Sequence, residues 1–224
     1  MFWDSTFLLL IPAFVFALYA QNKVKSTYRK YLDVRSARGL TGAQAARRLL
    51  DAAGLPQVEI EVVDGELTDH YDPRVRKLCL SRANHAGDSV AALGVACHEA
   101  GHALQHARGY VPLQLRQSIF PVANFGSNLA MPLFFVGFLF HFPVLMDIGI
   151  LVYLVAAFFT LLTLPVEFDA SKRAVVLLNR HGIVTPEESG HVKAVLNAAA
   201  LTYVAAALMA VLQLVRLIML RGRR

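Results

Sequence analysis

The stretch Cys97-His98-Glu99-Ala100-Gly101-His102 decides how this chain is interpreted. It matches the pattern His-Glu-x-x-His. On a helix, residues i and i+4 share one face, so His98 and His102 can reach the same metal ion. Imidazole nitrogens are common zinc ligands. Glu99 leaves the helix about 100° from His98, where it can take a proton from a water that zinc has acidified. The pattern therefore predicts metal-assisted hydrolysis, with a peptide bond as the first expectation.

The residues before this pattern favour a helix. The run from Asp88 to Cys97 is apolar and rich in helix formers, and Asp88 or Ser89 can serve as the N-cap. The alternative is an amphipathic helix whose histidines are four residues apart by coincidence. Burying two histidines and a glutamate without a metal would be costly, which favours the metal site.

A third metal ligand is expected from a later segment. His106 lies eight residues after His98, about 12 Å along the helix axis, too far to share one ion. The metzincin pattern requires glycine and histidine where Gln105 and Arg108 stand. A glutamate from a later helix is the other common solution. Glu167, which opens a polar segment after a long apolar run, is the best candidate.

The composition indicates a membrane protein. Of the 224 residues 56% are hydrophobic, and the mean hydropathy is +0.47, which points to several membrane spans. The net charge of +6 is interpreted first as membrane topology, and no basic-aromatic surface or phosphate loop suggests a nucleic-acid partner. Cys79 and Cys97 form no disulfide framework, and Cys97 is interpreted as a small buried apolar residue.

The apolar runs divide the chain into alternating parts. We expect transmembrane helices at 5–20, 121–140, 146–164 and 196–220, a cytoplasmic α+β part at 22–117, and cytoplasmic helices carrying the third ligand at 165–193. A cleaved signal peptide is the alternative for the first run. It lacks a positive leading region and contains Asp4, so we expect an uncleaved anchor with its N-terminus outside.

The polar part before the metal helix is expected to form a helix and a small sheet. Thr41 and Gln44 predict the capped start of a helix that ends near residue 53. Alternation at 58–63 and a second run at 75–81 predict strands. A strand beside the metal helix can bind an extended peptide by backbone pairing. His70, between the two runs, is either a ligand or a loop histidine bonded to a neighbouring aspartate.

Several later residues are further candidates. Asn124, Ser127 and Asn128 share a face of their run and are expected to contact other helices. His181, His191 and Tyr203 could stabilise an oxyanion, with surface histidines and a membrane-belt tyrosine as the alternative. These candidates stand beside His70 as possible supporting residues.

The positive charges orient the chain. Segments 21–117 and 166–193 hold most of the Lys and Arg and lie on the side of the metal pattern, so that side is expected to be cytoplasmic. The basic tail at 221–224 disagrees, because four spans place it outside.

The combined segments resemble the bacterial YugP-like family. The resemblance rests on His98-Glu-Ala-Gly-His102-Ala-Leu-Gln, Asp69-His-Tyr-Asp-Pro73, Pro121-Val-Ala-Asn124 with Gly126-Ser127, and Leu164-Pro-Val-Glu167-Phe-Asp-Ala, and covers nearly the whole chain. That family is described as neutral zinc metallopeptidases of the membrane. The resemblance implies a zinc-dependent membrane endopeptidase.

The site also resembles that of the HtpX and CAAX prenyl protease gluzincins. Their pattern Glu-x-x-x-Asp supplies the third ligand and an aspartate that supports a histidine ligand. Carried over, the glutamate falls on Glu167, but Ser171 occupies the place of the aspartate. Asp169 is only two residues on, about 200° round a helix. Asp169 and Ser171 therefore both remain candidates for the supporting group.

We therefore predict a mainly α-helical integral membrane protein with about four spans and a small α+β zinc-peptidase domain at the membrane interface. It would be a multi-pass protein of the bacterial plasma membrane that cleaves peptides or membrane proteins on the cytoplasmic side. Zn²⁺ would be held by His98, His102 and Glu167, with Glu99 as general base. The alternatives are a non-catalytic zinc-stabilised scaffold and a metal-handling protein. Oligomeric state cannot be read from the sequence.

Overall fold

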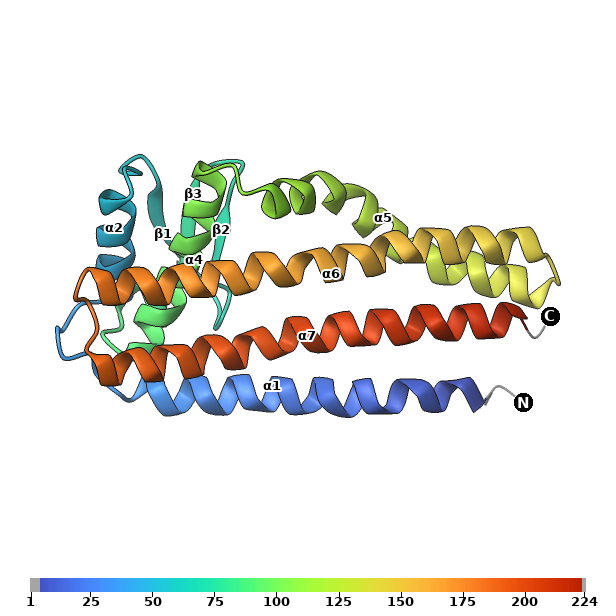
Figure 1. The fold of residues 1–224 in the computed structure, drawn as a ribbon, viewed down its shortest axis with the longest axis horizontal. Helices are drawn as coiled ribbons and strands as arrows, with labels where there is room; N and C mark the ends of the chain where they lie inside the picture. The colour runs from blue at the N-terminus through green and yellow to red at the C-terminus, as the bar shows by residue number, and fades with distance from the viewer. Residues whose placement is uncertain (1–4, 223–224) are drawn as a thin grey trace. The chain divides into compact units, whose positions relative to one another are not determined.

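A computed structural model describes residues 5–222, and these are mainly helical (Figure 1). A short 3₁₀ helix η1 opens the described chain. The elements in order are η1 Ser5–Leu10, α1 Ile11–Leu32, α2 Gly42–Ala52, β1 Glu59–Val63, β2 His70–Asp72, β3 Lys77–Ser81, α3 Arg82–Ala86, α4 Val90–Ala107, α5 Val111–Leu139, α6 Pro143–Arg180 and α7 Pro186–Gly222. The predicted mainly helical chain with a small sheet is confirmed.

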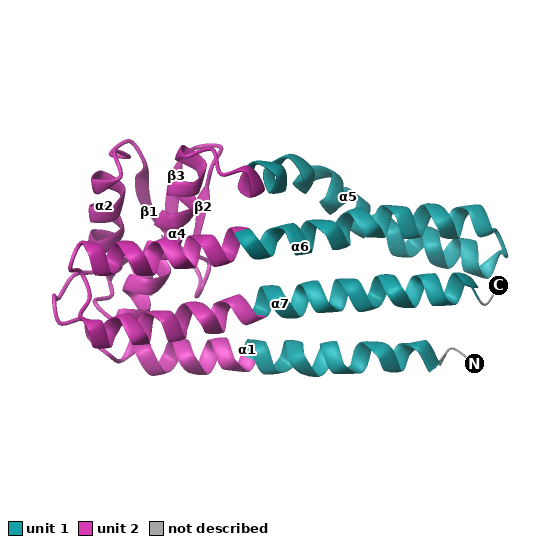
Figure 2. Cartoon of the chain, viewed as in Figure 1, with its two compact units in different colours: residues 1–21, 114–165, 202–224 teal, residues 22–113, 166–201 magenta. Residues whose placement is uncertain are grey.

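The chain forms two compact units (Figure 2). Among the described residues, unit 1 comprises 5–21, 114–165 and 202–222, and unit 2 comprises 22–113 and 166–201. Within residues 5–222, four helices are long and apolar enough to cross a membrane: Ser5–Leu32, Val111–Leu139, Pro143–Arg180 and Pro186–Gly222. Within unit 1, Phe134, Met146, Leu217 and Leu220 form a buried cluster.

Unit 2 contains the sheet, whose strand order is β1-β3-β2. β1 pairs with β3 in parallel, from Glu59 opposite Lys77, and β2 pairs with β3 antiparallel, with His70 opposite Cys79. β2 therefore lies at one edge. The sheet follows the expected strand runs, and the 67–73 segment adds the short strand β2.

The caps that the sequence predicts are present. The Thr41 side chain accepts a hydrogen bond from the Gln44 backbone N–H, and the Gln44 side chain accepts one from the Thr41 backbone N–H. Ser89, one of the two caps considered for α4, accepts a hydrogen bond from the Ala92 N–H. Each cap satisfies backbone donors that the helix itself leaves open.

α4 runs through the core of unit 2. Its own buried side chains include Leu93, Cys97 and Leu104. They belong to one core with buried residues of α2, the sheet, α6 and the start of α7, which include Leu49, Leu50, Leu78, Leu80, Leu178 and Val192. Cys97 is fully buried, as expected of a small apolar residue. The metal pattern is thus carried by the most enclosed helix of the unit.

The helices extend beyond the spans expected from the apolar runs. α1 does not stop near residue 20 but continues to Leu32, since its polar second half has no Gly or Pro and is rich in helix formers. α5 begins at Val111 rather than near 121. The run 165–193 is not separate from its neighbours, because α6 spans Pro165 and α7 continues from Pro186 to Gly222.

Pro165 illustrates why sequence signals fail at these boundaries. A proline in a helix interior costs about 3 kcal/mol and usually ends or bends the helix. Val166 and Ala170, which follow it on α6, are both fully buried. Their packing in unit 2 keeps the helix continuous.

The expectation for Asn124, Ser127 and Asn128 is also wrong. All three are exposed in the structure. Ser127 and Asn128 donate hydrogen bonds to the carbonyl of Asn124 on their own helix. A polar side chain in an apolar helix can thus form its hydrogen bond to the backbone of its own helix and needs no partner helix.

Candidate metal centre

The candidate site is built on the second half of α4. His98 and His102 are one helical turn apart and share a face, and their rings meet edge to face with centroids 4.8 Å apart. Their side chains are 13% and 10% exposed. Glu99 is also buried. Three polar side chains on one enclosed helix need a common partner, because burial without one is unfavourable.

Gly101 lets α6 approach this part of α4. A Cβ placed on Gly101 would lie 2.7 Å from the backbone carbonyl oxygen of Ala170. That spacing leaves no room for a side chain, so the two backbones meet at this point only because residue 101 is glycine. Glu167 precedes Ala170 by one turn of α6, and the contact therefore places its carboxylate beside the two histidines.

His98, His102 and Glu167 form one cluster. Oε2 of Glu167 lies 3.2 Å from Nε2 of His98 and 3.5 Å from Nε2 of His102. One potential ligand atom from each residue lies within 4.8 Å of the others. The Glu167 side chain is only 3% exposed. The structure thus brings together the three residues that the sequence predicts as ligands.

The donor set fits zinc. Ligand atoms of a tetrahedral zinc ion, bound at about 2.0–2.1 Å, lie roughly 3.3 Å apart. The separations of 3.2 and 3.5 Å from the Glu167 oxygen to the two Nε2 atoms agree with that spacing. Two imidazoles and one carboxylate are also a donor set found in zinc hydrolases, where a fourth position stays open.

Gln105 sets the orientation of His102. Its side-chain Nε2 donates to the Val166 carbonyl and to Oδ2 of Asp169, each at 2.8 Å. Because both partners only accept, the amide can face only one way, and Oε1 is left 3.0 Å from Nδ1 of His102. That nitrogen must then carry the proton, which leaves Nε2 with a free lone pair toward Glu167.

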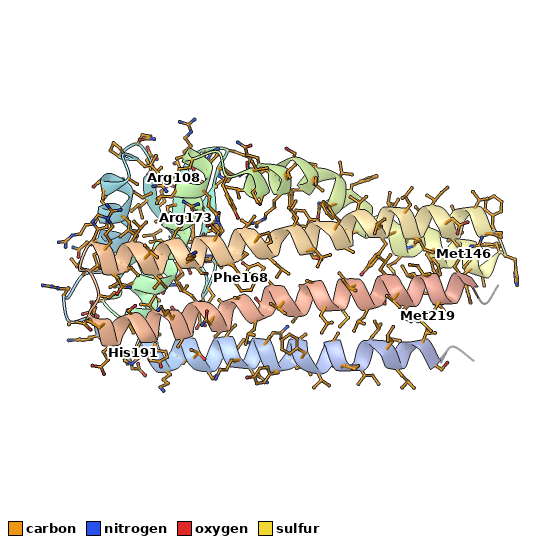
Figure 3. All side chains as sticks on the ribbon, viewed as in Figure 1. Arg108, Met146, Phe168, Arg173, His191 and Met219 are labelled. Carbon is orange, nitrogen blue, oxygen red and sulfur yellow. The ribbon has the colours of Figure 1, made fainter. Side chains whose placement is uncertain are left out.

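Asp169 acts through Gln105 rather than on a histidine directly. Its Oδ2 also accepts a hydrogen bond from Nε of Arg173, at 2.5 Å. The Arg173 guanidinium in turn lies over the Tyr110 ring, 5.7 Å from its centroid. Figure 3 labels Arg173 on α6. Arg173, Asp169 and the fully buried Gln105 therefore form a series of hydrogen bonds that ends at His102.

Ser171 supports the other histidine. Its hydroxyl oxygen lies 3.0 Å from Nδ1 of His98. As with His102, engaging Nδ1 leaves Nε2 directed at Glu167. The two supporting residues weighed from the sequence are thus both used, one for each histidine, and Asp169 needs Gln105 as the connection.

The electrostatics of the cluster favour a cation. Burial lowers the pKa of His102, but the hydrogen bond to Glu167 and the negative charge of Glu99 raise it more, so the net pKa lies above the ordinary value. The carboxylates therefore stabilise positive charge at this imidazole. A divalent cation would bind there in competition with a proton.

The remaining histidine candidates lie outside the cluster. His70 is exposed on β2, and its Nδ1 lies 2.8 Å from the Thr68 carbonyl, so neither Asp69 nor Asp72 is its partner. His181 is exposed. His191 stacks on Tyr31, with ring centroids 4.8 Å apart. The structure gives His70 and His191 other neighbours, and none of the three histidines joins the cluster of His98, His102 and Glu167.

Tyr203 belongs to unit 1, whereas the cluster belongs to unit 2. It is half-buried on α7 and has a partner of its own. The structure assigns it no part in the cluster.

Comparison with known proteins identifies the family. Residues 6–222 match the family described as "Putative neutral zinc metallopeptidase". The chain belongs to this family. The "Putative membrane protease YugP" of Bacillus subtilis (strain 168) is 48% identical to the chain over 217 residues, which cover 96% of each chain. No solved structure matches the chain.

Membership of the zinc metallopeptidase family agrees with the cluster. The family implies zinc, and the three clustered side chains offer a suitable donor set. The sequence interpretation did not include Gln105, nor Arg173 and Tyr110 behind it. The position of Gln105 three residues after His102 places it on the same side of the helix, which was the available signal.

Proposed function

We propose that this protein is a membrane-embedded zinc-dependent endopeptidase whose active site is the cluster on α4 and α6. His98, His102 and Glu167 would hold the zinc ion, and Glu99 would act as general base. The observation that carries the proposal is the three-residue cluster within 4.8 Å, with both histidines held at Nδ1 and a buried carboxylate on the residue after His98.

Zinc, when bound, supplies a Lewis acid that acidifies water and polarises a carbonyl. Glu99 takes the proton of the attacking water and returns it to the leaving amine. Its burial keeps the carboxylate in a low-dielectric site, where it interacts strongly with neighbouring charges. Gln105 and Ser171 hold the two imidazoles at Nδ1, so both Nε2 atoms would be available to a zinc ion.

The edge strand β2 is the natural place for substrate. It contacts α4 through Tyr71, whose hydroxyl lies 2.9 Å from Nδ1 of His106. One side of β2 pairs with β3, and its other side pairs with no strand among residues 5–222. An extended peptide can add to such an edge by backbone hydrogen bonds.

The site is proposed to face the cytoplasm of a bacterial cell. Positive residues concentrate in the segments that carry the cluster, and four helices are long and apolar enough to cross the plasma membrane. Peptides and membrane proteins are the expected substrates. The orientation is tested by cysteine labelling of intact cells at exposed residues of unit 2, where protection from an impermeant reagent is expected.

The experiment for the proposed activity compares zinc content and peptide cleavage in three proteins. The wild type is expected to hold one zinc per chain and to cleave unfolded protein substrates. Glu167→Ala should lose the zinc, because a ligand is removed. Glu99→Gln should keep the zinc and lose cleavage, because it removes a base and no ligand.

Two results would count against the proposal. Zinc retained by Glu167→Ala places the third ligand elsewhere. Cleavage retained by Glu99→Gln removes the base from the mechanism. A purely structural zinc site would require a fourth protein ligand, and the two histidines it would recruit, His70 and His106, are bonded to Thr68 and Tyr71 instead.

A further inference from the structure

A cavity of about 320 Å³ lies in unit 2 against the C-terminal half of α4. It is lined by residues from α4, from β2, from the turn after β2 and from the segment before β1. These are Leu55, Gln57, Val58, Tyr71, Arg76, Ala103, His106 and Ala107. The site described above uses none of these side chains.

The cavity is adjacent to the metal centre along the helix. Ala103 directly follows His102, and His106 lies one turn further on the same face, about 6 Å along the axis. Tyr71 comes from β2, the strand proposed to pair with substrate. A peptide that pairs with β2 would therefore lie beside this cavity, which Tyr71 lines.

The lining has the polarity of a carboxylate site. Arg76 is its permanent cation, and no lining residue is an aspartate or glutamate. Arg76 is exposed, and the ion pairs formed within residues 5–222 do not include it. Arg74, two residues earlier, is by contrast neutralised by Asp72, which it meets at 2.8 Å.

Hydrogen-bond donors add to this charge. The Tyr71 hydroxyl lies 2.9 Å from Nδ1 of His106; when this hydroxyl donates to Nδ1, Nε2 carries the ring proton and can donate to another partner. The Gln57 amide is a further donor on the wall, and the rest of the lining is aliphatic. A short apolar stem that ends in a carboxylate fits this combination, because guanidinium groups bind carboxylates through charge-assisted hydrogen bonds.

We propose that this cavity is a substrate subsite that binds a carboxylate of the peptide against Arg76 and His106. The inference rests on the proposed peptidase function. The carboxylate is an acidic side chain or the C-terminus of the peptide. The cavity volume of about 320 Å³ lies at the lower end of the range for small-molecule pockets, about 300–1,000 Å³. It therefore suits one or two peptide residues.

The test is peptide binding to zinc-loaded Glu99→Gln protein, which the proposed mechanism leaves unable to turn over. Three fluorescent peptides of one sequence serve as probes. The first has an internal glutamate and an amidated end, the second replaces that glutamate by glutamine, and the third keeps the glutamine but has a free C-terminal carboxylate. Fluorescence anisotropy gives each dissociation constant.

The variants are Arg76→Gln and Arg76→Glu, each added to Glu99→Gln, with Arg82→Gln as the matched control. Arg82 is also exposed and loses the same charge, but it pairs with Asp64 and does not line the cavity. Arg76→Gln should raise the dissociation constant of a carboxylate-bearing peptide about tenfold or more. The peptide without a carboxylate should be unaffected by it, and Arg82→Gln should change none of the three.

Each outcome is decisive. If Arg76→Gln weakens binding of the first peptide alone, the occupant is an acidic side chain. If it weakens binding of the third peptide alone, the occupant is the C-terminal carboxylate. Arg76→Glu should then favour the peptide without a carboxylate. Equal binding of all three peptides, or an equal change in Arg76→Gln and Arg82→Gln, overturns the subsite.

Cleavage by the wild type is measured in parallel and separates the two proposals. If Arg76-dependent binding is found but no peptide is cleaved, the proposed peptidase function fails and the carboxylate site stands. If peptides are cleaved with no preference that depends on Arg76, only the subsite fails.

Discussion

Replacing Gly101 by alanine tests how the metal centre is assembled. A Cβ at this position would lie 2.7 Å from the carbonyl oxygen of Ala170. Ordinary carbon–oxygen contacts begin at roughly 3.3 Å, so α4 and α6 must separate by about 0.6 Å. The obstacle is backbone and not the end of a flexible side chain, so no rotamer change can relieve it.

The expected effect on zinc is larger than the effect on folding. Metal ligands must keep their distances within about 0.2 Å, and Glu167 lies one turn from the displaced Ala170. We expect zinc affinity to fall at least tenfold, comparable with losses of about 10–100-fold when supporting groups are removed. Folding stability should change less. Overpacking costs about 1–3 kcal/mol, and the helix propensity of alanine, about 1 kcal/mol better than that of glycine, offsets part of that cost.

Gly94→Ala is the matched control. It lies on the same helix and gains the same helix propensity, but its Cβ would meet only a Val192 methyl group at 3.4 Å, an ordinary contact. Zinc affinity is measured by competition with a chelator, and the melting temperature of the metal-free protein is measured alongside. Gly94→Ala should bind zinc as the wild type does.

The reasoning is refuted if Gly101→Ala binds zinc with wild-type affinity. A similar loss in both glycine variants would also refute it, because the effect would then not depend on the contact with Ala170. A fall in melting temperature that fully accounts for the lost zinc would indicate unfolding rather than displacement of Glu167.

Three further outcomes are expected. Gln105→Leu should weaken zinc binding about 10–100-fold in the chelator assay, because it removes the group that fixes Nδ1 of His102, and unchanged affinity would exclude that role. Zinc affinity should fall as the pH is lowered, and the fall should begin above the ordinary histidine pKa of about 6.5, because zinc needs the neutral imidazole and the pKa of His102 is raised; an affinity that stays constant as the pH is lowered to that value would contradict it. Thr41→Ala should lower the stability of unit 2 by about 1 kcal/mol, seen as a lower melting temperature, and Thr41→Ser should restore it.

The sequence predicted helix caps and strands well, because these depend on interactions between residues that are close together in the chain. The caps at Thr41 and Ser89 arise from side chains that accept from backbone groups three residues away. The sheet runs follow from alternation within a few residues. Helix ends inside apolar runs were predicted less well, as at Pro165, because packing of residues such as Val166 overrides the local cost.

The candidate site divides in the same way. His98, Glu99 and His102 are readable because helical spacing alone places the two histidines on one face. Glu167 was proposed from its place after an apolar run, but its distance from the histidines depends on α4 and α6 meeting at Gly101. Gln105 was missed because a buried amide has no metal chemistry of its own, and its role appears only with its partners.

The amino-acid sequence alone therefore determines the metal-binding helix, the apolar runs and the chemistry that they favour. These features depend on residue type and on spacings of a few residues. The connection of Gln105 to Asp169, the meeting of Ser171 with His98 and the carboxylate-suited cavity at Arg76 follow from the folded chain. They depend on contacts between residues that are far apart in sequence, and such contacts form only when the helices and strands of unit 2 pack together.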